Sequence, residues 1–284
     1  MADAVLPVLV WIRILELLPV RDRLRAASVC RLWRDLVRDR ALWRDVDVRP
    51  DELSARSLQC LVRRWFHDNL RVLRLRGLVD SGINRRLLTP ALLRELSTRC
   101  PQLLCLSVDD ADLRNIPYDS LPPSLTRLEL RRCLIPGSWF CCWAVPRLQH
   151  LVVHSIDTFE SHHLLNVASH YSLKTLSVSG FLKIHDADIE QAAPDLEELE
   201  RFVLRGSFIS DWAMEFIGRH MIRLRFLEIR SAGSLTSTGL ERLTSLRDLE
   251  TLGLDLSDRV SPGAVIALCQ ALPRLRNLSV EFRD

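Results

Sequence analysis

The sequence predicts an α/β solenoid, in which short parallel strands alternate with helices, preceded by a small all-α unit of three helices. Two observations lead to this prediction. From Leu70 onward a Leu-x-x-Leu-x-Leu pattern, with aliphatic substitutions, recurs nine times at a regular spacing. The N-terminal segment has no such pattern and is instead apolar on almost every side of its first predicted helix.

The first predicted helix covers Val5 to Leu18, and only Arg13 and Glu16 carry charge within it. A helix that is apolar all round must be buried on more than one side. Pro19 ends this helix, because proline cannot continue a helical hydrogen-bond ladder. The segment therefore needs more cover than a single neighbouring helix supplies.

Two further helices follow. Asp22 is expected to cap the second helix, and residues 29–37 read as a third helix with Trp33, Leu36 and Val37 facing inward. A unit of roughly 40 residues is too small to surround the first helix completely. One face of that helix is therefore expected to meet a partner protein.

The spacing of these residues resembles the F-box family, whose members bind the adaptor Skp1 in cullin–RING ubiquitin ligases. The matching positions are Leu6-Pro7, Val10, Ile14, Leu15, Leu18-Pro19, Asp22, Val29-Cys30, Trp33, Leu36, Leu42-Trp43 and Val46. Val8 and Trp11 depart from the family pattern, and both enlarge the apolar surface. The alternative is a helical unit that only caps the rest of the chain.

The resemblance implies an F-box over residues 1–48 and a contact with Skp1 made mainly by its first helix. The residues expected to bind Skp1 are Leu6, Pro7, Val10, Trp11, Ile14, Leu15, Leu18 and Pro19. Trp33, Leu36 and Trp43 are expected to support the unit from inside.

Residues 49–284 are predicted to form one repeat domain. It opens with an amphipathic helix from Leu53 to Phe66. The central residues of the nine repeated patterns are then separated by 33, 22, 23, 25, 26, 25, 25 and 26 residues. A period of this length with this pattern is typical of a leucine-rich-repeat solenoid. The first, longer interval contains residues 77–89, which we interpret as an inserted loop.

Each repeat is expected to contain a strand followed by an antiparallel helical segment, and stacking of repeats completes the core. Strands are then expected to line the concave face of a curved solenoid, with helices on its convex face. This layout resembles the cysteine-containing leucine-rich repeats of F-box/LRR proteins, and Cys133 lies where such repeats place their cysteine.

The outward side chains of the strands form the candidate surface for a target protein. Its early part is rich in arginine and its last part is more acidic, so the early part is expected to favour an acidic or phosphorylated segment. The alternative is that these arginines are ordinary solvated charges. The residues expected to bind a target are Arg74, Arg76, Arg127, Arg131, His150, His154, Arg205, Phe226 and Arg230.

Composition argues against several other classes of protein. The formal net charge of +3 is too small, and aromatic residues at 6% are too few, to indicate a nucleic-acid-binding protein. No apolar run has the roughly 20 residues needed to cross a bilayer, and no signal peptide is expected. The eight cysteines are expected to be buried, reduced thiols in a cytoplasmic or nuclear protein.

No enzyme site is expected. His150, His154, His162 and His163 lack the spacing of a zinc site, and there is no glycine-rich phosphate-binding loop. A Cys/His enzyme would need an activated cysteine in a cleft, which the solenoid does not predict. We therefore expect no metal and no cofactor.

The resemblance implies a non-catalytic substrate receptor of an SCF ubiquitin ligase, which binds Skp1 and, through it, cullin-1 and the RING subunit. The repeat domain would then hold proteins for ubiquitination and proteasomal degradation. A non-degradative interaction scaffold outside a ligase remains the alternative.

Overall fold

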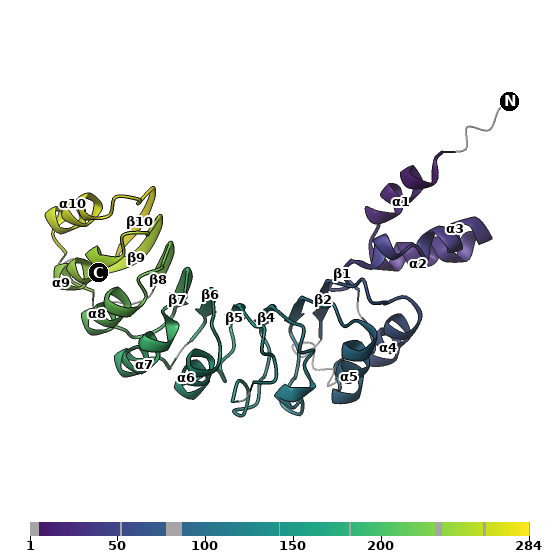
Figure 1. Cartoon of the computed structure of the whole chain (residues 1–284), viewed down its shortest axis with the longest axis horizontal. Coiled ribbons are helices and arrows are strands. Elements are labelled where there is room, and N and C mark those ends of the chain that lie inside the picture. The colour runs from purple at the N-terminus through teal and green to yellow at the C-terminus, as the bar shows by residue number, and fades with distance from the viewer. Residues whose placement is uncertain are drawn as a thin grey trace. The chain divides into compact units, whose positions relative to one another are not determined.

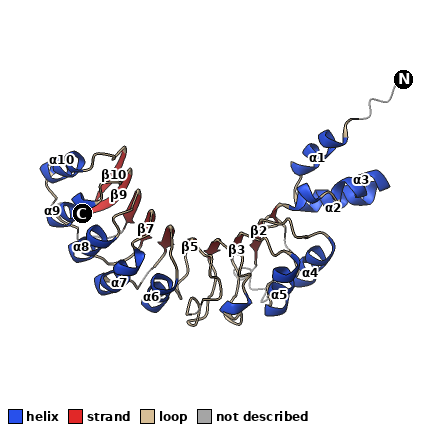
Figure 2. Cartoon of the chain, viewed as in Figure 1, coloured by secondary structure: helices blue, strands red, loops and turns tan. Residues whose placement is uncertain are grey.

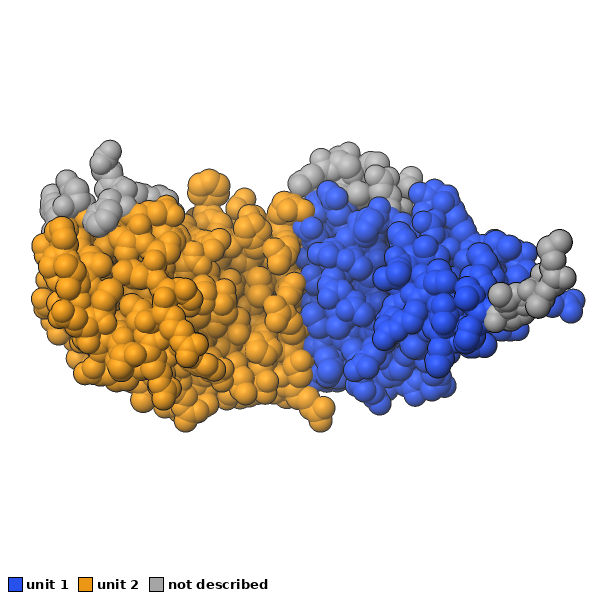
Figure 3. Space-filling view, turned by 90° about the horizontal axis from the view of Figure 1, so that it is seen from above, with its two compact units in different colours: residues 1–125 blue, residues 126–284 orange. Residues whose placement is uncertain are grey.

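A computed structural model of the 284-residue chain describes residues 6–51, 53–77, 87–141, 143–181, 183–230, 235–257 and 260–283. The chain divides into two compact units, Met1–Leu125 and Thr126–Asp284 (Figure 3). The predicted boundary between residues 48 and 49 lies inside the first of these units and stays a prediction.

The N-terminal unit begins with the three predicted helices and a short 3-10 helix. They are α1 (Val8–Glu16), α2 (Val20–Val29), α3 (Arg31–Val37) and η1 (Arg40–Trp43). The prediction that Asp22 caps α2 is wrong, because Pro19 occupies the N-cap position and Asp22 lies in the first turn. Cys30 caps α3 instead, and its Sγ accepts a hydrogen bond from the Trp33 amide at 3.5 Å.

Trp43 connects these helices to the residues that follow. It is fully buried, and its indole N–H donates to the Val37 carbonyl at 2.7 Å. Its ring stacks on Trp65, with centroids 5.2 Å apart, and lies 6.1 Å from the ring of Phe66. The opening helices are therefore packed on the residues directly after α4 (Ala55–Arg64), which is the amphipathic helix predicted from the sequence.

The opening segment is not purely helical, because it also supplies a strand. β1 (Asp45–Asp47) pairs in parallel with β2 (Val72–Arg76), and Val46 lies opposite Leu73. β2 pairs in the same way with β3 (Cys105–Asp109), and the unit also contains α5 (Pro90–Arg99) and η2 (Tyr118–Ser120). Most of the loop predicted at residues 77–89 lies outside the described residues.

The described part of the C-terminal unit contains seven parallel strands, β4–β10, which follow one another in chain order (Figures 1 and 2). The strands are β4 (Arg127–Arg131), β5 (His150–His154), β6 (Thr175–Ser179), β7 (Arg201–Arg205), β8 (Phe226–Arg230), β9 (Thr251–Ser257) and β10 (Asn277–Arg283). The helices are α6 (Ser161–His170), α7 (Asp186–Ala192), η3 (Ala193–Leu196), α8 (Asp211–His220), α9 (Ser237–Arg242), η4 (Leu243–Ser245) and α10 (Pro262–Ala271). Figure 1 shows α6–α10 together on one side of the strands.

The predicted register is confirmed by the strand pairing. The central leucines of the repeated pattern lie opposite one another, as in Leu128 with Leu151 and Leu151 with Leu176. Phe202 takes the equivalent place on β7 and lies opposite Leu227 on β8. All of these side chains are fully buried, so the repeats share one continuous core.

The prediction of a helix in every repeat is wrong for the two shortest intervals. Between β3 and β4 the described residues contain only η2, and between β4 and β5 they contain turns without a helix. Intervals of 22 and 23 residues leave little room for a ten-residue helix such as α6. Trp139 and Phe140 fill the core from these turns. Within the described ranges, no helix is long and apolar enough to cross a membrane.

The expectation that the cysteines are buried is wrong for Cys30, Cys60, Cys141 and Cys269, whose residues are exposed. Cys100 and Cys133 are buried as expected, and burial raises the pKa of the Cys100 thiol to about 12. Cys142 lies outside the described residues.

Candidate protein-interaction surfaces

Helix α1 divides its apolar residues between two sides. Trp11 and Leu15 are spaced by four residues, so they share the side that faces α3 and η1. Leu15 is 3% exposed, and the Trp11 ring lies 5.6 Å from that of Trp33. The prediction that Leu15 contacts Skp1 therefore conflicts with its position in the interior of the helical unit.

The opposite side of α1 is exposed. Leu9 is 75% exposed and Leu17 is 86% exposed, although both are leucines. We call the exposed apolar side chains of this segment the α1 surface; they are Leu6, Val8, Leu9, Val10, Ile14 and Leu17. Leucines this exposed are uncommon within one contiguous patch and indicate an interaction site. The prediction that this chain leaves one face of the first helix uncovered is confirmed.

The residues predicted to bind Skp1 overlap the α1 surface only in part. Leu6, Pro7, Val10 and Ile14 are exposed, and Pro19 is exposed at the start of α2. Trp11 and Leu18 are half-buried. The predicted set did not include Leu9 or Leu17; for Leu17, the three-residue spacing from Ile14 is the signal that could have placed it outward.

Arg23 holds the end of α1 in place. Its guanidinium donates to four backbone carbonyls: Leu15 at 3.0 Å, Glu16 at 2.8 Å, Leu18 at 2.9 Å and Leu42 at 2.6 Å. Burial lowers the pKa of Arg23, while Glu16 and Asp45 oppose that shift. Glu16 and Leu18 lie at the C-terminal end of α1, where a helix leaves its last carbonyls without an intrahelical partner, whereas the Leu15 carbonyl also accepts the Leu18 amide at 3.2 Å.

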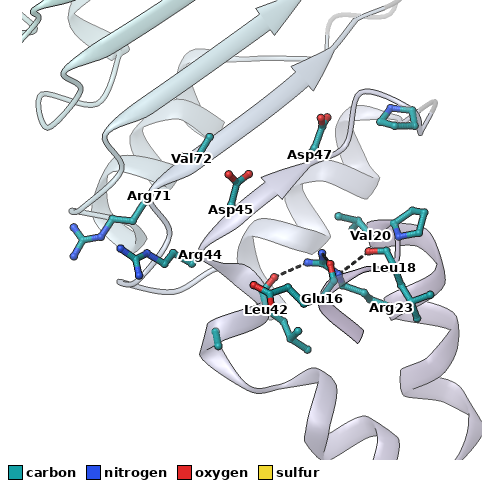
Figure 4. A pocket seen from close by; sticks show the side chains of 13 residues that line it. Glu16, Leu18, Val20, Arg23, Leu42, Arg44, Asp45, Asp47, Arg71 and Val72 are labelled. Atoms are coloured by element: carbon teal, nitrogen blue, oxygen red, sulfur yellow. Dashed lines mark hydrogen bonds between the residues drawn. The ribbon is translucent and has the colours of Figure 1, made fainter. Parts of the chain in front are cut away.

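A cavity of about 600 Å³ lies beside the Arg23 guanidinium, between the opening helices and the strands β1 and β2. Figure 4 shows Arg23 within it, bonded to Leu18 and Leu42. Carboxylates and guanidinium groups both line the cavity, so it has no single charge character that would select a ligand. We interpret Arg23 as a positioning residue for the α1 surface.

The second candidate surface lies on the strands. Side chains alternate along each strand, so one set points into the core and the other outward. We call the outward set of β4–β10 the strand face. It includes Arg127, Arg131, His150, His154, Arg205, Phe226 and Arg230 of the predicted target-binding residues. Arg74 and Arg76 lie on β2 in the N-terminal unit.

Every predicted arginine has a carboxylate partner. Arg74 is bonded to Asp45, and Arg76 lies 3.9 Å from Asp110. On β4, Glu129 is shared by two arginines, Arg127 at 2.6 Å and Arg131 at 3.8 Å. These side chains are therefore less available to an acidic ligand than the sequence suggested.

Arg205 and Arg230 belong to a denser network around Glu228. The Nη2 atom of Arg205 donates a hydrogen bond to each carboxylate oxygen of Glu228, at 2.8 and 2.9 Å. Arg230 is only 15% exposed and lies 3.2 Å from Glu228, 2.9 Å from Asp255 and 3.3 Å from Glu281. Burial alone would raise the pKa of Glu228, but the bonds from the two arginines outweigh it and lower that pKa. Arg230 is thus a structural residue of the strand face.

The two histidines of the strand face are half-buried and already bonded. His150 Nδ1 lies 3.0 Å from Thr175 Oγ1, and His154 Nδ1 lies 2.6 Å from Ser179 Oγ. Burial lowers the pKa of His150, Arg127 and Lys174 add to that shift, and Glu200 opposes it. Across the described part of the chain, no group of three or more His, Cys, Asp or Glu side chains is arranged to hold a metal ion.

Phe226 is half-buried because an arginine covers it. The guanidinium carbon of Arg201 lies 3.5 Å from the centre of the Phe226 ring. Arg201 was not among the residues predicted to bind a target. Arg201 directly precedes the core residue Phe202, just as Arg127, which was predicted to bind a target, precedes Leu128. This equivalent position in the repeat is the signal that could have identified Arg201.

Comparison with known proteins agrees with both parts of this arrangement. The family model F-box-like matches residues 4–49. In the solved structure of the yeast Rad7 and Elc1 complex, one chain matches with a TM-score of 0.53 and 18% identity, over 80% of this chain and 60% of that one. This likeness supports the fold alone.

An F-box-like segment followed by leucine-rich repeats defines the class: the chain belongs to the F-box/LRR protein family. It is similar over 97% of its length to F-box/LRR-repeat protein 12. The mouse protein is 33% identical and the human protein 32% identical, and the alignment covers 87% of each.

Proposed function

We propose that this protein is the substrate-recognition subunit of an SCF ubiquitin ligase. The α1 surface binds Skp1, which connects through cullin-1 to the RING subunit and the ubiquitin-charged enzyme. The strand face binds the target protein. The chain itself contributes no catalytic group and acts by raising the effective concentration of a target lysine at the thioester.

The exposure of Leu9 and Leu17 carries this proposal. Covering an apolar surface stabilises a complex by roughly 25 cal/mol per Å² before the costs of association. The α1 surface has this character, and the F-box-like match over residues 4–49 supports Skp1 as its partner. F-box/LRR proteins are generally adaptors without catalytic activity, which supports the same role here.

The test is a double variant, Leu9→Asp with Leu17→Asp, in the full chain. Both residues are exposed, so the folded chain should tolerate the change, whereas two carboxylates buried in an apolar contact should abolish Skp1 capture. We expect Skp1 affinity to fall at least about 100-fold by titration calorimetry, because central apolar contacts dominate such interfaces. Leu15→Asp is unsuitable, because that side chain is in the interior.

Phe181→Asp with Phe208→Asp is the matched control, since these side chains are 91% and 76% exposed in the C-terminal unit. It should bind Skp1 as the wild type does. Wild-type affinity in the Leu9/Leu17 variant would overturn the proposal. Capture of Skp1 without cullin-1 and the RING subunit would instead favour the scaffold role.

A further inference from the structure

Arg201 differs from the other arginines of the strand face. Within the part of that face whose side chains the structure describes, each of the others lies within 4 Å of a carboxylate. Arg201 makes no ion pair or hydrogen bond through its guanidinium to any described residue, and its printed contact is the Phe226 ring. Among the described residues, no carboxylate is therefore in direct contact with its guanidinium.

Phe226 holds this guanidinium without using its hydrogen-bond donors. A cation over an aromatic ring is attracted to the ring face, and the N–H groups of arginine point outward in the plane of the guanidinium. At 3.5 Å from the ring centre, Arg201 is in contact with that face. The contact restricts the side chain and leaves a planar fork of donors available to an acceptor with two oxygens.

Charges of both signs surround Arg201. Burial of the side chain is the main cause that lowers its pKa; Glu228 opposes that lowering, and Arg205 and Arg127 add to it. The oxygens of Glu228 are already bonded by Arg205 and Arg230. A bound anion would relieve the repulsion between these cations.

Small side chains lie in register beside this site. Val152, Ser177 and Val203 follow one another across β5, β6 and β7. Val203 is buried and the other two are half-buried, so no long side chain rises from this row. A segment of another protein can therefore approach the sheet closely next to Arg201.

We infer that Arg201, backed by Phe226, binds a side-chain carboxylate of a target-protein segment that lies over β5–β8. This inference rests on the proposed function and names the chemistry that the strand face selects. A carboxylate fits better than a phosphate dianion, because Arg201 is the one arginine of the strand face, among those whose side chains are described, that no carboxylate contacts, and Glu228 acts on it from nearby. The neighbouring arginines that could complete a phosphate site are held by Glu129 and Glu228.

The inference can be tested with the full chain bound to Skp1 and a random dodecapeptide library. We expect the enriched peptides to share an aspartate or glutamate. In the best peptide, replacing that residue with its amide should weaken binding about tenfold by fluorescence anisotropy, the usual scale for one charge-assisted bidentate contact. With Arg201→Gln, the acid and amide peptides should bind equally.

Arg219→Gln is the matched control. Arg219 lies 5.9 Å from the Phe216 ring centre but is paired with Glu215 at 2.6 Å on α8, away from the strand face. It should retain the tenfold preference for the acid. Thermal melting of each variant checks that the fold is intact.

Three results would overturn the inference. The first is that the library yields no enriched peptides, or enriched peptides that share no aspartate or glutamate. The second is a preference for the acid peptide that survives Arg201→Gln. The third is a phosphoserine peptide that binds through Arg201 more tightly than the acid peptide does. Skp1 binding is measured on the same preparations. A chain that binds Skp1 but shows no acid preference contradicts only this inference, whereas loss of Skp1 binding contradicts the proposed function.

Discussion

At the scale of single residues, His163 shows how a buried polar side chain can be held by its own turn and by the preceding repeat. It is fully buried in α6. Its Nδ1 accepts the Glu160 amide at 3.2 Å, so the proton is on Nε2, which lies 3.2 Å from the Pro136 carbonyl. Burial lowers the pKa of His163 and His162 adds to that, while the Pro136 carbonyl and Glu160 oppose it.

This lowered pKa predicts a loss of stability in mild acid. The unfolded chain binds a proton at His163 more readily than the folded chain, so stability falls as the pH drops below the unfolded value of about 6.5. His163→Gln keeps an acceptor at the capping position but cannot be protonated in this range. We expect its melting temperature to fall less than that of the wild type between about pH 7.5 and about pH 5.5.

Phe159→Leu is the control for this measurement. Its ring stacks on His163 with centroids 5.4 Å apart, so the change weakens packing without removing the titrating group. That variant should have a lower melting temperature than the wild type at both pH values. The fall in its melting temperature between the two pH values should equal that of the wild type. An equal acid-induced loss in His163→Gln and in the wild type would refute the assignment.

At the scale of elements, the repeats share a turn directly after the strand. Asp110, Arg132, Ser155, Gly180 and Gly206 follow β3, β4, β5, β6 and β7, and all five have positive φ. Non-glycine residues adopt this region at a cost of about 1 kcal/mol, which the aligned backbone hydrogen bonds offset. The Ser155 amide, for example, donates to the Ser179 carbonyl at 2.6 Å.

Gly206 is the position in this series where a side chain is least tolerable. Its φ is +85°, and a Cβ atom there would lie 1.8 Å from the Gly180 carbonyl oxygen. We expect Gly206→Ala to lower the free energy of unfolding by at least about 2 kcal/mol in urea titrations, because the backbone of two repeats must shift. Gly263→Ala, in the open first turn of α10, should be neutral or slightly stabilising.

If both alanine variants unfolded at the same urea concentration, the steric argument for Gly206 would fail.

Hydrogen bonds between helix starts also connect neighbouring repeats. Asp186 accepts bonds from the amide and hydroxyl of Ser210, at 2.7 and 2.6 Å, and Asp211 does the same for Thr236. Each acceptor lies at the start of one helix and holds the N-cap residue of the next.

At the scale of the whole molecule, the chain is unevenly covered. The inward side chains of β4–β9 are buried, whereas the apolar side chains of the α1 surface are exposed. A ligand that binds only the folded state stabilises it by mass action, by about 2.7 kcal/mol at a free concentration 100 times its Kd. If Skp1 is that ligand, the stabilisation should be largest at α1, where Skp1 would cover the exposed apolar side chains.

Hydrogen exchange should therefore respond locally to Skp1. Amides of α1, Val8–Glu16, should exchange quickly in the free chain and become protected when Skp1 is added. Amides of β5–β8 should remain protected in both states, because their side chains form the repeat core. The Leu9→Asp/Leu17→Asp variant should show no added protection, and Skp1-dependent protection confined to the strands would contradict this assignment of the surface.

Much of this architecture can be predicted from local patterns. Nine strands lie at the predicted positions, because alternation along a strand and a regular repeat length are both visible without knowing the fold. The uncovered first helix could be predicted for the same reason, since its apolar residues surround the helix axis. The missing helices before β4 and β5 were also implied by the short intervals of 22 and 23 residues.

The pairing of charges, in contrast, was decided by the tertiary structure. By composition alone, Arg201 and Arg205 are equivalent arginines on one strand. Parallel pairing of β7 with β8 places Phe226 opposite Arg201, while Glu228 is within reach of Arg205. The sequence by itself determined that a helical unit and a repeat sheet would form and which side chains would point outward. Which of those side chains keep an unpaired charge depended on strand register, because the partners lie about 25 residues apart and meet only when the sheet forms.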